Sequence, residues 1–251
     1  MPLLEICAGS VVSAKRAEQG GAQRIELCEQ LEVGGVTPSI EMLQEVLAST
    51  NIRTHVLIRT RPGDFIYSNQ EIDAMVASVL AVKNAGAHGV VIGALDRSGR
   101  LDESAITTLI NAANGLSLTF HRAIDVANEP MLLLEKIIDF GFDYVLTSGQ
   151  QASAEAGIPL LKTMQQQFGK HISIIAGGGI NSLNIGHIAM ETAISQFHAS
   201  ARNQSPNIAV GIEHQFGIRS NNTQSTKPVE TNLDEVKRLS AFCQGFTPGW
   251  V

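Results

Sequence analysis

The sequence predicts an α/β fold with a single (β/α)8 barrel of the TIM type, and three observations indicate this architecture. Short runs rich in Val, Ile and Leu recur along the chain, and an amphipathic stretch follows each of them. Runs of this kind are typical of parallel strands that are buried on both faces. Eight strand–helix units can be traced, and the length of 251 residues matches the ~250 residues of a single barrel.

The expected strands are brief, and each is bounded by a turn or by the start of an amphipathic stretch. They cover Leu3–Cys7, Arg24–Cys28, Thr54–Arg59, Gly89–Gly93, Ser117–Arg122, Tyr144–Ser148, Ile172–Ala176 and Gln196–Ala199.

The amphipathic stretches between the strands predict helices, most with a capping residue or proline in front and several with glycine behind. The first begins at Ser10 and ends before Gly20, and the third stops at Gly86. The expected helices cover Ser10–Gln19, Ser39–Ala48, Asn69–Ala85, Asp102–Asn114, Pro130–Phe140, Ala152–Phe168, Asn181–Ala193 and Asn232–Cys243.

Repeated right-handed crossovers leave two architectures, a closed eight-stranded barrel and an open doubly wound sheet. The count of eight and the chain length favour the barrel, so we expect one domain over residues 1–251. Residues 202–230 interrupt the alternation because they are rich in Asn, Ser, Gln and Thr and have little periodicity. We expect an irregular loop there, before the last helix, with a functional lid as the alternative.

Composition narrows the class of protein. Hydrophobic residues make up 44% of the chain and charged residues 17%, which is enough apolar material for a large core and excludes disorder. The net charge of −6 lacks the broad basic footprint of a nucleic-acid binder. Three cysteines do not form a secreted disulfide framework, and neither a signal peptide nor a membrane span is apparent. A cytoplasmic protein is therefore expected.

The ends of the first two strands carry the same pair of functional groups. The first strand ends Glu5-Ile6-Cys7 and the second ends Glu26-Leu27-Cys28. Because side chains alternate along a strand, each carboxylate shares a face with the thiol two residues later. If that face points into the barrel, two acids and two thiols converge at the carboxyl ends of the strands, where barrel active sites lie.

Other strand ends supply basic and small residues. Arg59 ends the third strand and Arg61 follows it, and His121 is the second-last residue of the fifth strand. The seventh strand runs into Gly177, Gly178 and Gly179, where consecutive glycines before a helix could bring backbone N–H groups close to a phosphate, with Ser200 as a contact from the neighbouring unit.

Each of these groups also has a structural interpretation, which the sequence leaves open. The carboxylates could pair with the arginines in an ion network, the glycines could merely permit a tight turn, and the thiols could be small buried hydrophobes. The histidine of the eighth strand, His198, is interpreted as structural because no nucleophile adjoins it. Common nucleophile and metalloprotease motifs are missing from the sequence.

Taken in order, these strand ends resemble the CutC family, the copper homeostasis protein family. The resemblance is carried by eight motifs that run to Ala201: Glu5–Cys7, Gly20–Cys28, Gly34–Ser39, Ile58–Phe65, Thr119–Ala123, Leu146–Gly149, Gly177–Ile180 and Phe197–Ala201. It implies a cytosolic barrel, usually oligomeric, assigned to control of copper levels, with Cu(I) as the ligand of Cys7 and Cys28. Thr60 stands where family members commonly have proline, which leaves both flanking arginines in place.

Two hypotheses follow. In the first, the protein binds Cu(I) through Cys7 and Cys28, because soft Cu(I) suits thiolate ligands and two can suffice. In the second, it is a barrel enzyme for a phosphorylated or carboxylated small molecule: Arg59 and Arg61 clamp the anion, and Glu26 and His121 exchange protons. In the second hypothesis, phosphate binds at the Gly177–Gly179 loop. The expected partner is a copper ion in the first hypothesis and a small anionic molecule in the second. A homo-oligomer is expected, without nucleic acid or membrane as partners.

Overall fold

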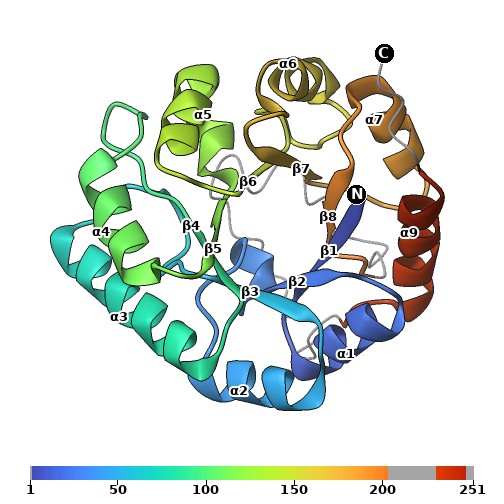
Figure 1. Ribbon diagram of the computed structural model, residues 1–251, viewed down its shortest axis with the longest axis horizontal. Coiled ribbons are helices and arrows are strands. Elements are labelled where there is room, and N and C mark those ends of the chain that lie inside the picture. Colours follow the sequence, from blue (N-terminus) through green and yellow to red (C-terminus); the bar gives the residue numbers. More distant parts are fainter. Residues whose placement is uncertain (1, 203–229, 247–251) are drawn as a thin grey trace, which may run out of the picture.

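Eight parallel strands close into a barrel in the computed structural model, which describes residues 2–202 and 230–246 (Figure 1). The strands are β1 (Leu3–Ala8), β2 (Arg24–Leu27), β3 (Arg53–Leu57), β4 (Gly89–Ile92), β5 (Ser117–Phe120), β6 (Tyr144–Thr147), β7 (Ser173–Gly177) and β8 (Gln196–Ala199). Each pairs with the next along the chain, and β8 pairs with β1. The predicted (β/α)8 architecture is therefore confirmed.

Helices surround the barrel on the outside and are ordered around it as in the sequence (Figure 1). They are α1 (Val11–Gln19), α2 (Ile40–Ser49), α3 (Asn69–Ala85), α4 (Glu103–Ala113), α5 (Pro130–Asp139), α6 (Ile158–Phe168), α7 (Ile185–Thr192) and α9 (Leu233–Gly245). Two short 3-10 helices, η1 (Leu31–Val33) and η2 (Arg122–Val126), follow β2 and β5.

The helix boundaries follow the expected capping chemistry. The Ser10 side chain accepts a hydrogen bond from the Ser13 amide at the start of α1. At α3, Ser68 and Glu71 form a reciprocal capping box, and Gly86 ends the helix in the left-handed conformation that glycine adopts without steric cost. These contacts satisfy backbone groups that a helix end leaves without partners.

Two helices begin well after the positions that the sequence predicts. The predicted helix over Ala152–Phe168 begins only at Ile158, because Gly157 packs against the chain that follows β6; a Cβ atom there would lie 1.8 Å from the Ser148 carbonyl oxygen. The predicted helix over Asn181–Ala193 begins at Ile185, after a turn in which the Asn181 and Asn184 side chains bond the Gly179 carbonyl.

Strand register determines which side chains point into the barrel. Glu5 lies opposite Arg24 and His198, and Cys7 lies opposite Glu26. The intervening residues Ile6 and Leu27 belong to the apolar layer between strands and helices, as the sequence predicts. A second, smaller apolar cluster lies inside the barrel and consists of Cys7, Cys28, Leu57 and Val91, with Leu31 packed against it.

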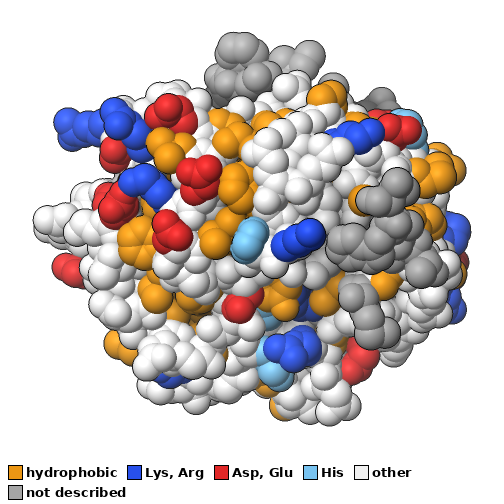
Figure 2. All heavy atoms as spheres, turned by 45° about the horizontal axis from the view of Figure 1, so that its top comes forward, with side chains coloured by type: hydrophobic (Ala, Val, Ile, Leu, Met, Phe, Trp, Pro, Cys, Tyr) orange, Lys and Arg blue, Asp and Glu red, His pale blue; other side chains and the backbone are white. Residues whose placement is uncertain are grey.

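The face in Figure 2 does not carry charged side chains of one sign alone. Acidic and basic side chains both occur on it, among scattered hydrophobic ones. Within the described residues, no helix is both long and apolar enough to cross a membrane. Most of the predicted irregular loop over 202–230 lies outside the described residues, although Arg202 forms an isolated bridge with Thr231 just before α9. The single-domain assignment of residues 1–251 accordingly stays a prediction.

Candidate metal centre

Two buried thiols lie side by side at the carboxyl ends of β1 and β2. The Sγ atoms of Cys7 and Cys28 are 3.4 Å apart, and both cysteines are free. Cys28 follows β2 directly, and its amide donates to the Ala8 carbonyl, so the β1–β2 ladder extends one step and holds both residues in register. The predicted convergence of the two thiols is thus present in the structure.

A carboxyl group and an imidazole adjoin the thiols. The Cys7 Sγ atom lies 3.6 Å from Oε2 of Glu26. His198, from β8, points Nδ1 at Oε1 of Glu5 at 2.7 Å, and its Nε2 lies 3.8 Å from Oε2 of Glu26. The His198 side chain is 13% exposed, so the whole group is shielded from solvent but is not fully enclosed.

Glu5 carries a negative charge in the interior of the barrel. Burial alone would raise the pKa of this carboxyl, but the Arg24 guanidinium and the hydrogen bond from His198 hold it well below its usual value. An ionised carboxylate only accepts hydrogen bonds, so the Nδ1 atom of His198 must be the donor. Arg24 is buried as deeply as Glu5, and its guanidinium carbon lies 4.2 Å from the ring centre of Tyr144.

The neighbouring groups of the cluster are shifted in the opposite direction. Burial is the main factor that raises the pKa of Glu26, with the charge of Glu5 adding to it. The hydrogen bond with Cys28, and then burial, raise the pKa of the Cys7 thiol. Burial would lower the pKa of His198, but its contacts with Cys7 and Glu5 and the nearby Glu26 outweigh this and raise it well above 6.5.

The ligand atoms of Cys7, Glu26 and His198 all lie within 4.8 Å of one another, which is the spacing of a potential metal site. The Cys28 sulfur contacts the Cys7 sulfur and lies outside this group of three. Two sulfur atoms and an imidazole nitrogen are soft or borderline ligands that suit Cu(I) and Zn(II) better than hard cations such as Mg²⁺. The residues present therefore fit a thiophilic metal ion.

Arg59, which the sequence predicted to clamp an anion, donates hydrogen bonds to three backbone carbonyls. Its Nη1 donates to the carbonyls of Val33 and Gly35 at 3.2 and 3.0 Å, and its Nη2 donates to Gly63 at 2.7 Å. The guanidinium is buried and ties the loop after β2 to the loop after β3. Its catalytic role stays a prediction, and these contacts describe a loop-bridging residue.

Arg61 and His121 contact residues other than the two thiols. Arg61 is paired with Glu71 and donates to Asp64 at 2.9 Å, at the start of α3. His121 accepts a hydrogen bond from the Ala123 amide at Nδ1, and burial, together with Arg59, lowers its pKa to about 3. Its ring centre lies 4.7 Å from that of Phe65, so it forms part of an aromatic wall.

The Gly177–Gly179 loop meets the end of β6. Gly178 has a φ of +100°, a conformation that favours glycine, and a Cβ there would lie 3.1 Å from the Ser148 Cβ and 3.7 Å from the Arg122 guanidinium carbon. Arg122 in turn donates to the Ser148 hydroxyl at 2.8 Å and to Asp125 at 2.7 Å. Ser200, beyond β8, is half-buried. Phosphate binding by Gly177, Gly178, Gly179 and Ser200 stays a prediction.

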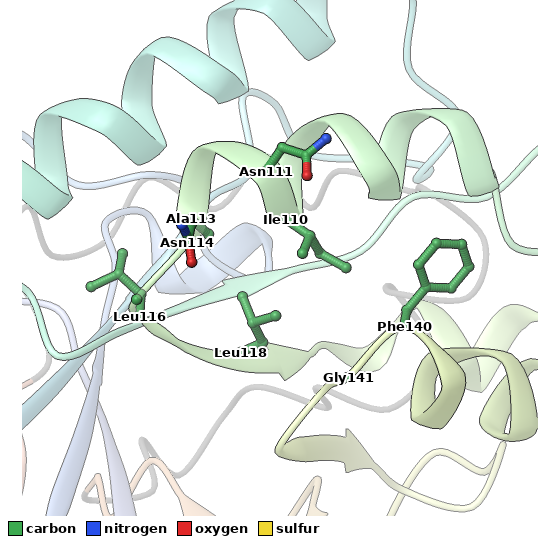
Figure 3. Close-up of a pocket in the computed structure, with 9 residues that line it drawn as sticks. Ile110, Asn111, Ala113, Asn114, Leu116, Leu118, Phe140 and Gly141 are labelled. Atoms are coloured by element: carbon green, nitrogen blue, oxygen red, sulfur yellow. The ribbon is translucent and has the colours of Figure 1, made fainter.

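A shallow pocket of about 290 Å³ lies far from this chemistry, where α4 leads into β5 at the opposite end of the barrel (Figure 3). Its lining includes Ile110, Asn111, Leu118 and Phe140 and contains no titratable side chain. It offers neither a metal ligand nor a proton donor, so the cluster at the thiols is the better candidate site.

Sequence reasoning missed the part that His198 takes in this cluster. The signal was topological: closure of the barrel puts β8 beside β1, so a histidine that faces inward on β8 must lie beside the Glu5–Cys7 face. The residues next to His198 in the sequence do not indicate its contact with Glu5, because the two residues are 193 positions apart.

The fold and the cluster define a β/α barrel with two buried thiols beside a carboxyl group and an imidazole, and comparison with known proteins gives its family. The sequence model of the CutC family matches residues 2–203, and the chain belongs to this family. A CutC family protein of Bacteroides fragilis is 44% identical over 249 residues, which are 98% of this chain and 97% of that protein. The human protein named copper homeostasis protein cutC homolog is 44% identical over 80% of this chain and 73% of its own length.

Solved structures agree with the fold. A CutC structure from Streptococcus agalactiae superposes with a TM-score of 0.76 at 30% identity, covering 80% of this chain and 99% of that one. Phosphoribosylanthranilate isomerase of Thermotoga maritima, with a TM-score of 0.59, 12% identity and coverage of 98% of this chain and 100% of that one, shares the barrel fold alone.

Proposed function

We propose that this protein takes part in copper homeostasis by binding Cu(I) between Cys7 and Cys28. The observation that carries the proposal is the 3.4 Å separation of the two sulfur atoms inside the barrel. Thiolates are the preferred ligands of Cu(I), and two of them can hold the ion. The names of the mammalian relatives, which are copper homeostasis protein homologs, support the same function.

The surroundings of the thiols favour a monovalent soft ion. Leu57, Val91 and Leu31 enclose the sulfur atoms on the apolar side. Such an enclosure limits the access of water and oxidants to the bound ion, and it lowers the local dielectric constant. A cytoplasmic location, where thiols stay reduced, and a homo-oligomeric state belong to this proposal as well.

Anaerobic titration of the reduced protein with Cu(I), in competition with a chromophoric Cu(I) chelator, tests the proposal. The wild-type chain is expected to bind one ion, and Cys7→Ser and Cys28→Ser are each expected to weaken binding by more than about tenfold. Cys243→Ser is the matched control, because Cys243 is also a free buried cysteine but lies on α9 outside the barrel. Equal affinity in all four proteins would overturn the proposal.

A barrel enzyme for a phosphorylated metabolite is a second candidate, and one observation favours it. Arg122 and Ser148 lie against Gly178 in the loop after β7, where the glycine backbone carries no side chain. Inorganic phosphate is expected to raise the melting temperature of the wild type and to leave that of Arg122→Gln unchanged. Identical melting curves with and without phosphate would exclude this function.

A further inference from the structure

We propose that His198 is the third ligand of the bound ion, so that Cu(I) is held by two sulfur atoms and the Nε2 atom of this imidazole. The inference deepens the proposed function and rests on it. It is carried by the placement of His198 on β8 with its ring against the Glu5–Cys7 face of β1.

The ring orientation of His198 is determined by Glu5. The Nδ1–H group donates to the ionised Glu5 carboxylate at 2.7 Å, and Glu5 is itself held by Arg24. With Nδ1 engaged in this way, Nε2 is the ring atom available to a metal. Histidine ligands in proteins commonly donate their second nitrogen to a carboxylate, which orients the ring and increases its basicity.

The Nε2 atom points toward the candidate metal position. It lies 3.8 Å from Oε2 of Glu26, and the ligand atoms of His198, Glu26 and Cys7 are mutually within 4.8 Å. Cys28 lies outside this group of three and meets it through its 3.4 Å contact with Cys7. An ion bound by the Cys7 sulfur lies close to the imidazole, and the Cys28 side chain must move toward that ion for both sulfur atoms and Nε2 to coordinate it together.

Ligand chemistry separates His198 from Glu26, the other candidate for the third position. Imidazole nitrogen is a borderline ligand that copper accepts, whereas a carboxylate oxygen is hard and suits Mg²⁺, Ca²⁺ or Mn²⁺. We therefore assign Glu26 to the surroundings of the ion, where its carboxyl contacts Cys7 without coordinating the ion. On binding, the protons of the two thiols and of Nε2 pass to solvent.

The other inward-facing histidines do not share this arrangement. The Nδ1 atom of His55 lies 3.4 Å from the Thr119 hydroxyl, and that of His121 accepts from the Ala123 amide. Neither belongs to a metal-ligating group within the described part of the chain, where Cys7, Glu26 and His198 form the one such cluster. The third ligand is therefore assigned to His198 alone.

The test compares two glutamine variants of the same cluster by chelator competition. His198→Gln is expected to weaken Cu(I) binding by about tenfold or more, and Glu26→Gln is expected to weaken it less than His198→Gln does. In X-ray absorption spectra, the first coordination shell of the wild type should contain two sulfur atoms and one nitrogen. His198→Gln should lose the nitrogen and keep both sulfur atoms.

Each outcome bears on a different claim. If the cysteine variants weaken binding but His198→Gln does not, and the wild-type spectrum shows sulfur alone, this inference fails and the dithiol proposal stands. A loss of affinity in Glu26→Gln with none in His198→Gln would assign the third position to oxygen and also overturn it. Equal affinity in the cysteine variants contradicts the proposed function itself. The wild-type spectrum decides the question even if His198→Gln does not fold.

Discussion

Glu5 and Arg24 form an ion pair that is enclosed inside the barrel, where each side chain is 1% exposed. They lie opposite each other on β1 and β2, and the guanidinium also stacks on Tyr144 from β6. His198 donates to the same carboxylate from β8. The one negative charge of Glu5 is therefore contacted from two other strands, and a third strand contacts its counter-ion, so the interior of the barrel depends on this charge.

Glu5→Gln is expected to destabilise the fold by about 3–5 kcal/mol, because it leaves the buried Arg24 charge without its counter-ion. Equilibrium unfolding in urea, followed by circular dichroism, measures the change. Glu191→Gln is the matched control, since Glu191 pairs with Lys162 at 3.8 Å on the surface and both side chains are about half exposed. That variant should change the free energy of unfolding by less than about 1 kcal/mol. Similar effects in the two variants would contradict the importance of the enclosed pair.

A close packing contact is expected to make Gly93 intolerant of a side chain. A Cβ atom at this position would lie 2.5 Å from Cε1 of His121, whose ring is fixed by its bond from Ala123 and by Phe65. Gly93→Ala should therefore cost about 1–3 kcal/mol through overpacking. Gly245→Ala, at the end of α9 with open space around it, is the control and should leave the urea midpoint unchanged or raise it slightly.

The stability of the protein is expected to fall with acidification in part because of His121. Burial and Arg59 lower the pKa of this residue to about 3 in the folded state, against an unfolded value near 6.5. Below pH 6.5 the unfolded chain binds a proton that the folded chain does not, so this stabilising contribution is present above pH 6.5 and is lost as pH falls towards 3. Between pH 7 and 5 the loss from this one group is about 2 kcal/mol.

His121→Asn isolates the contribution of His121 to the acid sensitivity. The asparagine carbonyl keeps an acceptor for the Ala123 amide but does not titrate. We expect the variant to be less stable than the wild type at pH 7 and to lose less stability on going to pH 5, both measured by urea unfolding. An equal loss in the two proteins would show that His121 is already protonated at pH 7 or exposed.

The sequence predicted the barrel because the signals for it are local and repeated. Buried strands produce continuous apolar runs, and helix caps such as Ser10 and Gly86 mark boundaries with short-range chemistry. The thiol pair was equally accessible, because Cys7 and Cys28 end adjacent strands with the same parity. Where the boundaries were wrong, as at Ile158, a tertiary contact of Gly157 that has no local signature had shortened the helix.

The remainder of the site depends on contacts that a linear pattern does not contain. His198 joins the thiols only when the barrel closes, and the charge of Glu5 is paired by Arg24 rather than by the arginines that follow β3. Arg59 illustrates the same limit. Its position at a strand end indicates anion binding, but the structure surrounds it with carbonyl oxygens from two loops.

The final prediction concerns Arg59 and its three carbonyl partners. Arg59→Lys should loosen the loop after β2, because an ammonium group cannot reproduce the fork that reaches Val33, Gly35 and Gly63 together. Hydrogen bonds to a charged group contribute about 1.5–3 kcal/mol, so hydrogen exchange of the Val33 and Gly35 amides should accelerate by about tenfold or more.

Arg61→Lys is the control for this measurement, because Arg61 bonds to Glu71 and to the segment at residues 64–66 instead. It should leave exchange at Gly35 unchanged. If Arg59→Lys alters neither amide but abolishes a melting-temperature shift by inorganic phosphate, Arg59 acts on an anion and the loop-bridging interpretation is wrong. If hydrogen exchange accelerates in Arg59→Lys, and phosphate does not shift the melting temperature of the wild type, the buried guanidinium serves the fold. It then holds the loop that packs over Cys28, whose sulfur would lie 3.4 Å from a Cβ atom added at Gly35.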